Sequence, residues 1–313
     1  MISPADKIAI VGAGVIGTSW AACFLAQGFK VAVTDPAPDA EQRLRAGLGE
    51  CWPALEEFGL APGASMDNLS FCADLAEAVK GAAFIQENGP ERLDAKHAML
   101  AAIEAAAPPD ALIASSTSGL LISDIQAGMK HPERLVLGHP FNPPHLIPLV
   151  EVLGGKATSE ENVAKAMDFY ASIGKKPIRL NREVKGHVAN RLQVALWREA
   201  FSLVEQGIAS VKDIDTAIAH GPGLRWALLG PFLNLHASGG AGGIEHTLRH
   251  LGPAQREWAR DLGTYPETDD YIEPIAQGVD DELQGYDFKA TLRERDALLV
   301  KLIAAKKKAG QIP

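Results

Sequence analysis

The sequence predicts an α/β domain with a doubly wound, mostly parallel sheet, followed by an all-α domain. Two observations support this: short apolar runs alternate with helical segments in the first half of the chain, and the alternation ceases after about Arg182. We therefore place the first domain at residues 1–183 and the second at 184–313. In a chain of 313 residues, each of two such domains is large enough to bury its own core.

Seven apolar runs are expected to form the strands of the sheet. They are KIAIVG (7–12), KVAVTD (30–35), AAFIQE (82–87), ALIAS (111–115), RLVLGH (134–139), PLVEVL (148–153) and KKPIRL (175–180). Nearly continuous apolar character is typical of strands that are covered on both faces by crossover helices.

The helix between the last two runs has clear end signals. Thr158 and Glu161 are expected to form a capping box, and Gly174 to end the helix. The apolar residues of its buried face are Val163, Ala166, Met167, Tyr170 and Ile173.

Beyond residue 183 the pattern is helical, with breaks at glycine and proline. HVANRLQVALWREAFSLVEQ, ending at Gly207, is expected to be one helix, and 288–309 a charged helix near the end of the chain. The broad apolar faces, as at Leu196, Leu203 and Val204, exceed what one crossover to the first domain covers. Homodimerisation through this domain is expected.

Composition excludes several function classes. The net charge is −9 and the pI about 5.5, so we expect no nucleic-acid partner. Cys23, Cys51 and Cys72 are odd in number and lack metal-ligand spacing, which favours reduced thiols and no metal site. Without a signal-like N-terminus or a long apolar run, we expect a cytoplasmic protein with no membrane segment.

A dinucleotide fingerprint follows the first strand. Gly12-x-Gly14-x-x-Gly17 opens a helix, and Asp35 ends the second strand 18 residues later. Glycines allow close approach of the backbone to a pyrophosphate at the helix N-terminus, and the acid accepts bonds from ribose hydroxyls. This pattern predicts a Rossmann-type domain that binds NAD through the glycines, Val15, Ile16 and Asp35. Asp35 disfavours a 2′-phosphate, and no second flavin-type motif accompanies the fingerprint.

Polar residues stand at the ends of the later strands. They are Ser118, His139, Asn142, Glu151 and, in GHVANRL, Asn190. Taken singly, four of them have a structural alternative: Ser118 as a helix cap, His139 as a buried core histidine, Glu151 as an ion-pair member and Asn190 as a helix surface residue. Their combination with a dinucleotide fold instead favours alcohol oxidation, which needs a base of near-neutral pKa beside the nicotinamide.

Motifs over nearly the whole chain resemble the 3-hydroxyacyl-CoA dehydrogenase family. They are GAGVIG, PERLDAK, SSTSGL, GHPFNPP, LVEV and GHVANR, in the family's order. The resemblance implies a two-domain NAD enzyme with a helical dimerisation domain. It implies that His139 is the general base, that Glu151 orients it, that Ser118 and Asn190 bond the substrate oxygen, and that Glu91, Lys96 and Asn142 contact the cofactor. A phosphogluconate-type enzyme would instead need a helix lysine that is missing between Gly186 and Gly207.

Two departures favour the branch of that family that acts on free acids. Residues 31–79 hold two arginines, no lysine and nine carboxylates, a charge that repels the phosphates of CoA. Arg225 and Trp226 interrupt a stretch that is uncharged in CoA-using relatives. We therefore hypothesise that Arg225 binds the carboxylate of a small 3-hydroxy acid. The alternative is a salt bridge between domains or subunits.

The resemblance within that branch is mixed. Residues 52–65 and ALWREA (195–200) are similar to carnitine dehydrogenases, whereas Asn190 followed by RLQ is similar to gulonate 3-dehydrogenases related to lambda-crystallin. L-carnitine is the first expectation and L-gulonate the second. A trimethylammonium group suits an aromatic wall, with Trp226, Trp197 and Trp52 available unless they only pack. A polyhydroxy acid needs hydroxyl partners, which Asn234 and His236 offer. A CoA-thioester dehydrogenase and a crystallin-like structural protein remain the alternatives.

Overall fold

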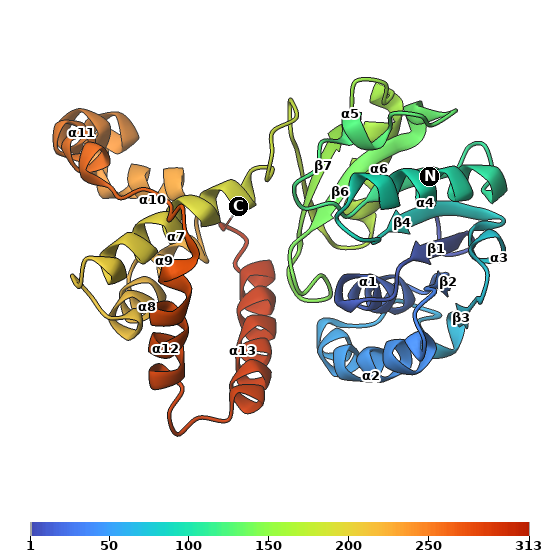
Figure 1. Cartoon of the computed structure of the whole chain (residues 1–313), viewed down its shortest axis with the longest axis horizontal. Coiled ribbons are helices and arrows are strands. Elements are labelled where there is room, and N and C mark those ends of the chain that lie inside the picture. The colour runs from blue at the N-terminus through green and yellow to red at the C-terminus, as the bar shows by residue number, and fades with distance from the viewer. Residues whose placement is uncertain (1, 313) are drawn as a thin grey trace. The chain divides into compact units, whose positions relative to one another are not determined.

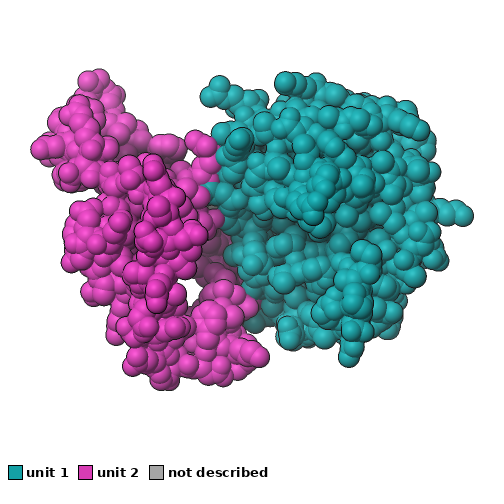
Figure 2. All heavy atoms as spheres, viewed as in Figure 1, with its two compact units in different colours: residues 1–190 teal, residues 191–313 magenta. Residues whose placement is uncertain are grey.

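The computed structural model describes residues 2–312. The chain divides into two compact units, residues 1–190 and 191–313 (Figure 2). The first unit contains one eight-stranded sheet, and the second contains helices. The predicted fold class is therefore confirmed: a Rossmann-type, mostly parallel sheet with helices, followed by a helical domain.

The strand order is β3-β2-β1-β4-β5-β6-β7-β8. The strands are β1 (Lys7–Val11), β2 (Lys30–Thr34), β3 (Leu69–Phe71), β4 (Ala82–Glu87), β5 (Leu112–Ser115), β6 (Leu135–Pro140), β7 (Leu149–Gly154) and β8 (Lys176–Arg179). All seven predicted runs form strands, and β3 is an edge strand that the prediction missed. The strands pair in parallel except for β6 and β7, which are antiparallel.

Helices cover both faces of this sheet (Figure 1). The first unit contains α1 (Val15–Ala26), α2 (Ala40–Phe58), α3 (Leu75–Val79), α4 (Leu93–Ala106), α5 (Ile122–Ile125) and α6 (Glu160–Ser172). One core cluster joins α1, α2 and α6 to the sheet through rings such as Trp20, Phe24 and Phe169, and a second joins α3, α4 and α5 to the other face. Each fully buried ring of this kind contributes about 1.5–3 kcal/mol.

The predicted capping box of α6 is wrong by one residue. Ser159, not Thr158, is the N-cap, and its hydroxyl accepts a bond from the Asn162 amide. Thr158 instead donates its hydroxyl to the Leu135 carbonyl and accepts the Gly155 amide, so it joins the helix entry to β6. The helix ends at Ser172, and Gly174 follows in the left-handed region at φ +80°.

The helices of the second unit begin with α7, which starts in the last two residues of the first. They are α7 (Ala189–Glu205), α8 (Val211–His220), α9 (Pro222–Trp226), α10 (Pro231–Ser238), α11 (Gly243–Asp261), α12 (Ile272–Glu282) and α13 (Phe288–Lys308). The predicted start of α7 at His187 is wrong, because Gly186 and His187 both have left-handed φ angles, +74° and +50°. No helix in residues 2–312 has the length and apolar character that a membrane span requires.

Candidate functional site

The glycine turn after β1 is shaped for close approach of a ligand. Gly12 has φ +98°, and a Cβ there would lie 2.7 Å from the Asn88 carbonyl oxygen. A Cβ on Gly17 would lie 1.9 Å from the Gly12 oxygen, so α1 packs closely on this turn. A Cβ on Gly14 would meet nothing within 4 Å, and no side chain caps α1. The turn therefore leaves open space at the N-terminus of α1, where backbone N–H groups favour an anion.

Asp35 is fixed beside this turn. Its Oδ2 accepts the Ala13 amide at 2.7 Å and its Oδ1 the Ala37 amide at 2.8 Å, directly after β2. Val15, at the start of α1, is 73% exposed, which is unusual for a large apolar side chain and suits a ligand-facing position.

Glu91, in the loop between β4 and α4, accepts hydrogen bonds from the loop that follows β5. Its Oε1 accepts the Thr117 hydroxyl at 2.6 Å and the amides of Ser118 and Gly119 at 2.9 and 2.8 Å. Burial opposes ionisation of this carboxyl, but the Thr117 and Gly119 bonds outweigh it and lower the pKa of Glu91. Glu91 is therefore an ionised clamp on the Thr117–Leu120 loop.

Lys96 is buried in an ion pair with Glu87. Its ammonium lies 2.9 Å from Glu87 Oε1 and 3.9 Å from Glu91 Oε2, and both Lys96 and Glu87 are almost fully buried. Ser115 donates to the other oxygen of Glu87 at 2.6 Å. Lys96 thus links Glu87, at the end of β4, to Glu91 in the following loop.

His139 and Glu151 face each other across the antiparallel strand pair. They are register partners in β6 and β7, and Nδ1 of His139 lies 2.8 Å from Oε2 of Glu151. The expectation that Glu151 ends its strand is wrong. β7 runs opposite to β6, so the start of β7 lies at the edge of the sheet where β6 ends.

The second oxygen of Glu151 is bonded to the beginning of α7. Oε1 accepts the amides of Val188 and Ala189 at 2.8 and 3.0 Å. Burial alone raises the pKa of Glu151, but the bonds from His139, Ala189 and Val188 outweigh burial, and the pKa is lowered. An ionised carboxylate only accepts hydrogen bonds, so Nδ1 of His139 carries the proton and Nε2 holds the lone pair. This pair can act as a general base.

Ser118 and Asn190 also meet near this edge. The Asn190 side-chain amide donates to the Ser118 carbonyl at 3.2 Å, and the Ser118 side chain is exposed. Asn142, in the loop after β6, is exposed as well.

One residue at this site was missed by sequence reasoning. His187 is buried, its ring centroid lies 5.1 Å from that of His139, and its Nε2 lies 3.1 Å from the Thr117 carbonyl oxygen. His187 is the first residue of the helix that the sequence predicts, and a histidine at a helix start gives no local sign of the left-handed turn that buries it.

Arg225 and Trp226 belong to the second unit. Both lie in α9, are exposed, and remain predicted substrate residues. Among residues 2–312, no hydrogen bond or ion pair engages the Arg225 guanidinium.

The other predicted substrate contacts differ in how far they are available. The side-chain amide of Asn234 already donates to the carbonyls of Leu229 and Gly230. Nδ1 of His236 accepts the Ile244 amide. Of the three tryptophans offered as an aromatic wall, Trp52 is buried in the core, while Trp197 and Trp226 are exposed.

A dinucleotide fits the first unit. The open turn at Gly14, the uncapped start of α1 and the oriented carboxylate of Asp35 supply an anion site and a ribose acceptor in the required order.

Comparison with known proteins agrees with this assignment. Residues 7–184 match the family model described as 3-hydroxyacyl-CoA dehydrogenase, NAD binding domain, and residues 186–268 match the model of its C-terminal domain. Together the two models cover most of the chain.

Individual relatives cover nearly the whole chain. L-carnitine dehydrogenase of Streptomyces coelicolor is 48% identical, over 99% of this chain and 98% of that protein. L-carnitine dehydrogenase of Bacillus cereus is also 48% identical, over 95% and 91%. The crystal structure of 5-formyl-3-hydroxy-2-methylpyridine 4-carboxylic acid 5-dehydrogenase, an NAD+-dependent dismutase, has a TM-score of 0.85 and 32% identity over 98% of this chain and 99% of that one.

Proposed function

The chain belongs to the 3-hydroxyacyl-CoA dehydrogenase family as an NAD-dependent oxidoreductase, and on that premise we propose that it oxidises L-carnitine, a small 3-hydroxy acid, to the 3-oxo acid. The choice of L-carnitine as substrate is supported by the near full-length similarity to L-carnitine dehydrogenases at 48% identity. The solved relative with the TM-score of 0.85 is likewise named for a carboxylic acid.

His139 is the proposed general base. Glu151 holds the proton on Nδ1, so Nε2 is free to take the hydroxyl proton of the substrate as the carbinol carbon loses its hydride. NAD+, when bound, supplies the acceptor for that hydride. The resulting imidazolium lies against the Glu151 carboxylate, which stabilises its charge.

Ser118 and Asn190 are the proposed donors to the substrate oxygen. The Asn190 side-chain amide bonds the Ser118 backbone carbonyl, so Asn190 lies next to the residue that bears the Ser118 hydroxyl. Such donors stabilise the negative charge that develops on the oxygen while its proton is transferred. Glu91 acts indirectly, because it fixes the loop that bears Ser118.

NAD is proposed to bind through the glycine turn, Val15, Ile16 and Asp35, with Glu91, Ser118 and Asn142 as further contacts. Lys96 is proposed to act through its ion pair with Glu87 and its approach to Glu91, as a support for the cofactor loop.

Arg225 is proposed to bind the substrate carboxylate. Its guanidinium has no partner in the described residues and lies beside the exposed Trp226, which suits a cationic group on the same small substrate. Arg225→Ala is expected to raise KM for L-carnitine at least about tenfold with little change in NADH affinity. Arg179→Ala, at an exposed arginine of the first unit that is paired with Glu160, is the matched control. An unchanged KM in Arg225→Ala would favour a subunit salt bridge instead.

Two structural details disfavour the other substrates. Arg43 and Arg45, the basic residues of the acidic segment, donate to the Pro38 carbonyl and to Glu41, so both already have partners within a segment that repels the phosphates of CoA. Asn234 and His236, offered as partners for the hydroxyls of gulonate, are bonded to the backbone. The relatives compared are named as dehydrogenases, which leaves a purely structural role without support.

Initial rates of NADH formation test the substrate. We expect a kcat/KM for L-carnitine at least about a hundredfold above those for L-gulonate, L-3-hydroxybutyrate and 3-hydroxybutyryl-CoA. Preference for the thioester would contradict the charge argument, and preference for L-gulonate would transfer the proposal to the other free-acid branch.

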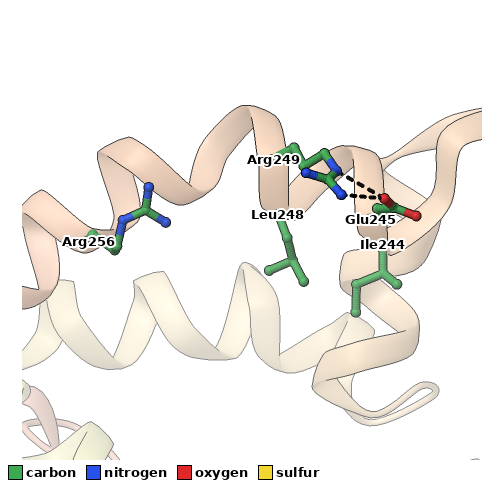
Figure 3. A pocket seen from close by; sticks show the side chains of 5 residues that line it. All are labelled: Ile244, Glu245, Leu248, Arg249 and Arg256. Carbon is green, nitrogen blue, oxygen red and sulfur yellow. Dashed lines mark hydrogen bonds and ion pairs between the residues drawn. The ribbon is translucent and has the colours of Figure 1, made fainter.

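A homodimer formed through the second unit is also proposed. Of the hydrophobic side chains buried within residues 2–312, only Val300 comes from the second unit, whereas Leu192 and Phe232 are 62% and 75% exposed. On α11, Ile244 and Leu248 line a hollow of about 630 Å³ with Arg249 and Arg256 beside them (Figure 3). An apolar floor with charged neighbours is typical of protein interfaces. Sedimentation velocity is expected to give twice the 33.2 kDa chain mass, and a stable monomer would contradict the proposal.

A further inference from the structure

His187 is a buried imidazole next to the proposed base, and the mechanism above does not use it. Its side chain is 1% exposed, and its ring is tilted by 52° to that of His139. Nε2 lies 3.1 Å from the Thr117 carbonyl oxygen, while Nδ1 has no hydrogen-bond partner in the described residues.

The protonation of this ring follows from its partner. A carbonyl oxygen only accepts hydrogen bonds, so Nε2 of His187 must carry the hydrogen. Nδ1 then either holds a lone pair or, in the imidazolium, a second buried proton without an acceptor. The second state is costly in a buried site that offers Nδ1 no acceptor, which favours the neutral Nε2–H tautomer.

The backbone at His187 is held in an unusual conformation. A φ of +50° is uncommon for a residue with a Cβ, and strained residues of this kind persist where the surroundings fix them. The next two amides, of Val188 and Ala189, donate to Glu151. The left-handed turn therefore sets the ring of His187 and the anchor of Glu151 at the same time.

We propose that His187 is a positioning residue, a fixed Nε2–H donor that ties the loop bearing Ser118 to the ring of His139. The loop is clamped on its other side by Glu91, through the Thr117 hydroxyl. His187 thus supports the donor side chain and packs against the base, without itself exchanging a proton. This inference rests on the proposed role of His139.

The charged groups around His187 are consistent with a neutral ring. His139 faces it from β6, Glu151 from β7 and Glu91 from the segment before α4, where the Lys96–Glu87 pair neutralises part of the charge. Burial is the main influence and lowers the pKa of His187, and His139 acts in the same direction. The Thr117 bond and the two glutamates act against it, but the pKa remains lowered.

Nitrogen NMR of the histidine-labelled full chain tests the tautomer without any assay of activity. With the His187 signals assigned by their loss in His187→Gln, we expect the neutral Nε2–H form throughout the range from about pH 6 to 9. Protonation of His187 within that range, or a proton on Nδ1, would overturn the inference. This result stands whichever acid proves to be the substrate.

Two substitutions test the positioning role. Phenylalanine keeps the ring volume but has no donor, whereas the amide of glutamine can place an N–H near the position of Nε2. We expect His187→Phe to lower kcat about tenfold with KM changed less than about threefold, and His187→Gln to retain more than about a third of wild-type kcat with the same acid limb of the pH profile. His131→Gln, at an exposed histidine paired with Glu133, is the control.

Each outcome of this comparison is decisive. Wild-type kcat in His187→Phe would mean that the ring only packs, and equal losses in both variants would mean that the imidazole itself takes part in proton transfer. NADH binding and thermal unfolding establish that each variant is folded. If the phenylalanine variant does not fold, a loss of more than about tenfold in His187→Gln still overturns the inference.

Discussion

Replacing Glu151 with glutamine tests whether the buried carboxylate sets the tautomer of His139, the proposed base. The carboxylate accepts three hydrogen bonds, one from His139 Nδ1 and two from the α7 amides, and is fully buried. Glutamine has one acceptor oxygen, so it can serve only one side. If the oxygen faces the amides, the NH2 group faces His139.

The two orientations of the glutamine amide differ in cost. Turning the NH2 group toward Val188 and Ala189 leaves those buried donors without an acceptor, at about 1–3 kcal/mol each. Turning it toward His139 forces the imidazole into the Nε2–H tautomer, which satisfies the hydrogen bonds but removes the lone pair needed for catalysis. The second orientation is the cheaper one. A wrong tautomer costs about 10⁴-fold at a Ser-His-Asp triad, and we expect a loss of about 10³-fold in kcat here.

The assay is steady-state NADH formation with L-carnitine, alongside fluorescence titration of NADH. We expect an unchanged Kd for NADH, because the substitution changes the tautomer of His139 and leaves the glycine turn unaltered. Glu161→Gln, at an exposed glutamate paired with Lys165, removes the same charge away from the site. A Glu151→Gln enzyme with kcat within about threefold of wild type would refute this reasoning.

Two further substitutions test the cofactor side. Asp35→Ala is expected to weaken NAD binding at least about tenfold and to reduce discrimination against NADP, since the carboxylate is held beside the glycine turn; an unchanged NAD/NADP ratio would contradict the ribose role. Glu91→Gln is expected to lower the melting temperature most at pH 7. Because the folded-state pKa of Glu91 is lowered, its stabilisation is present above the unfolded pKa and is lost as pH falls through the folded one. The difference in melting temperature between Glu91→Gln and wild type should therefore shrink below about pH 4. A difference that is constant with pH would show that the stabilisation by Glu91 does not depend on its charge.

Much of the first unit was predictable because its signals are local. Continuous apolar runs identify buried strands, and the glycine spacing with Asp35 identifies the turn that the structure shows. The edge strand β3 was missed because three residues, only one of them buried, leave almost no pattern. The antiparallel direction of β7 had an overlooked signal: the eight residues between β6 and β7 are too few for a parallel crossover.

Other features depend on information that is not local. Thr158 and Ser159 are both good cap residues, and only tertiary contacts from Leu135 decide which one caps α6. The left-handed φ of His187 depends on the surrounding site, as does its approach to His139. The sequence and its family resemblance therefore indicated the His139–Glu151 pair, which the structure brings together, but not the imidazole that packs against it.

The substitution His139→Ala is the most direct test that His139 is the general base. With L-carnitine near neutral pH, we expect kcat to fall about 10⁴-fold while the Kd for NADH stays within about twofold of wild type, because His139 acts on the substrate hydroxyl. A variant that kept wild-type turnover, or that lost NADH binding together with activity, would contradict the assignment of His139 as the base.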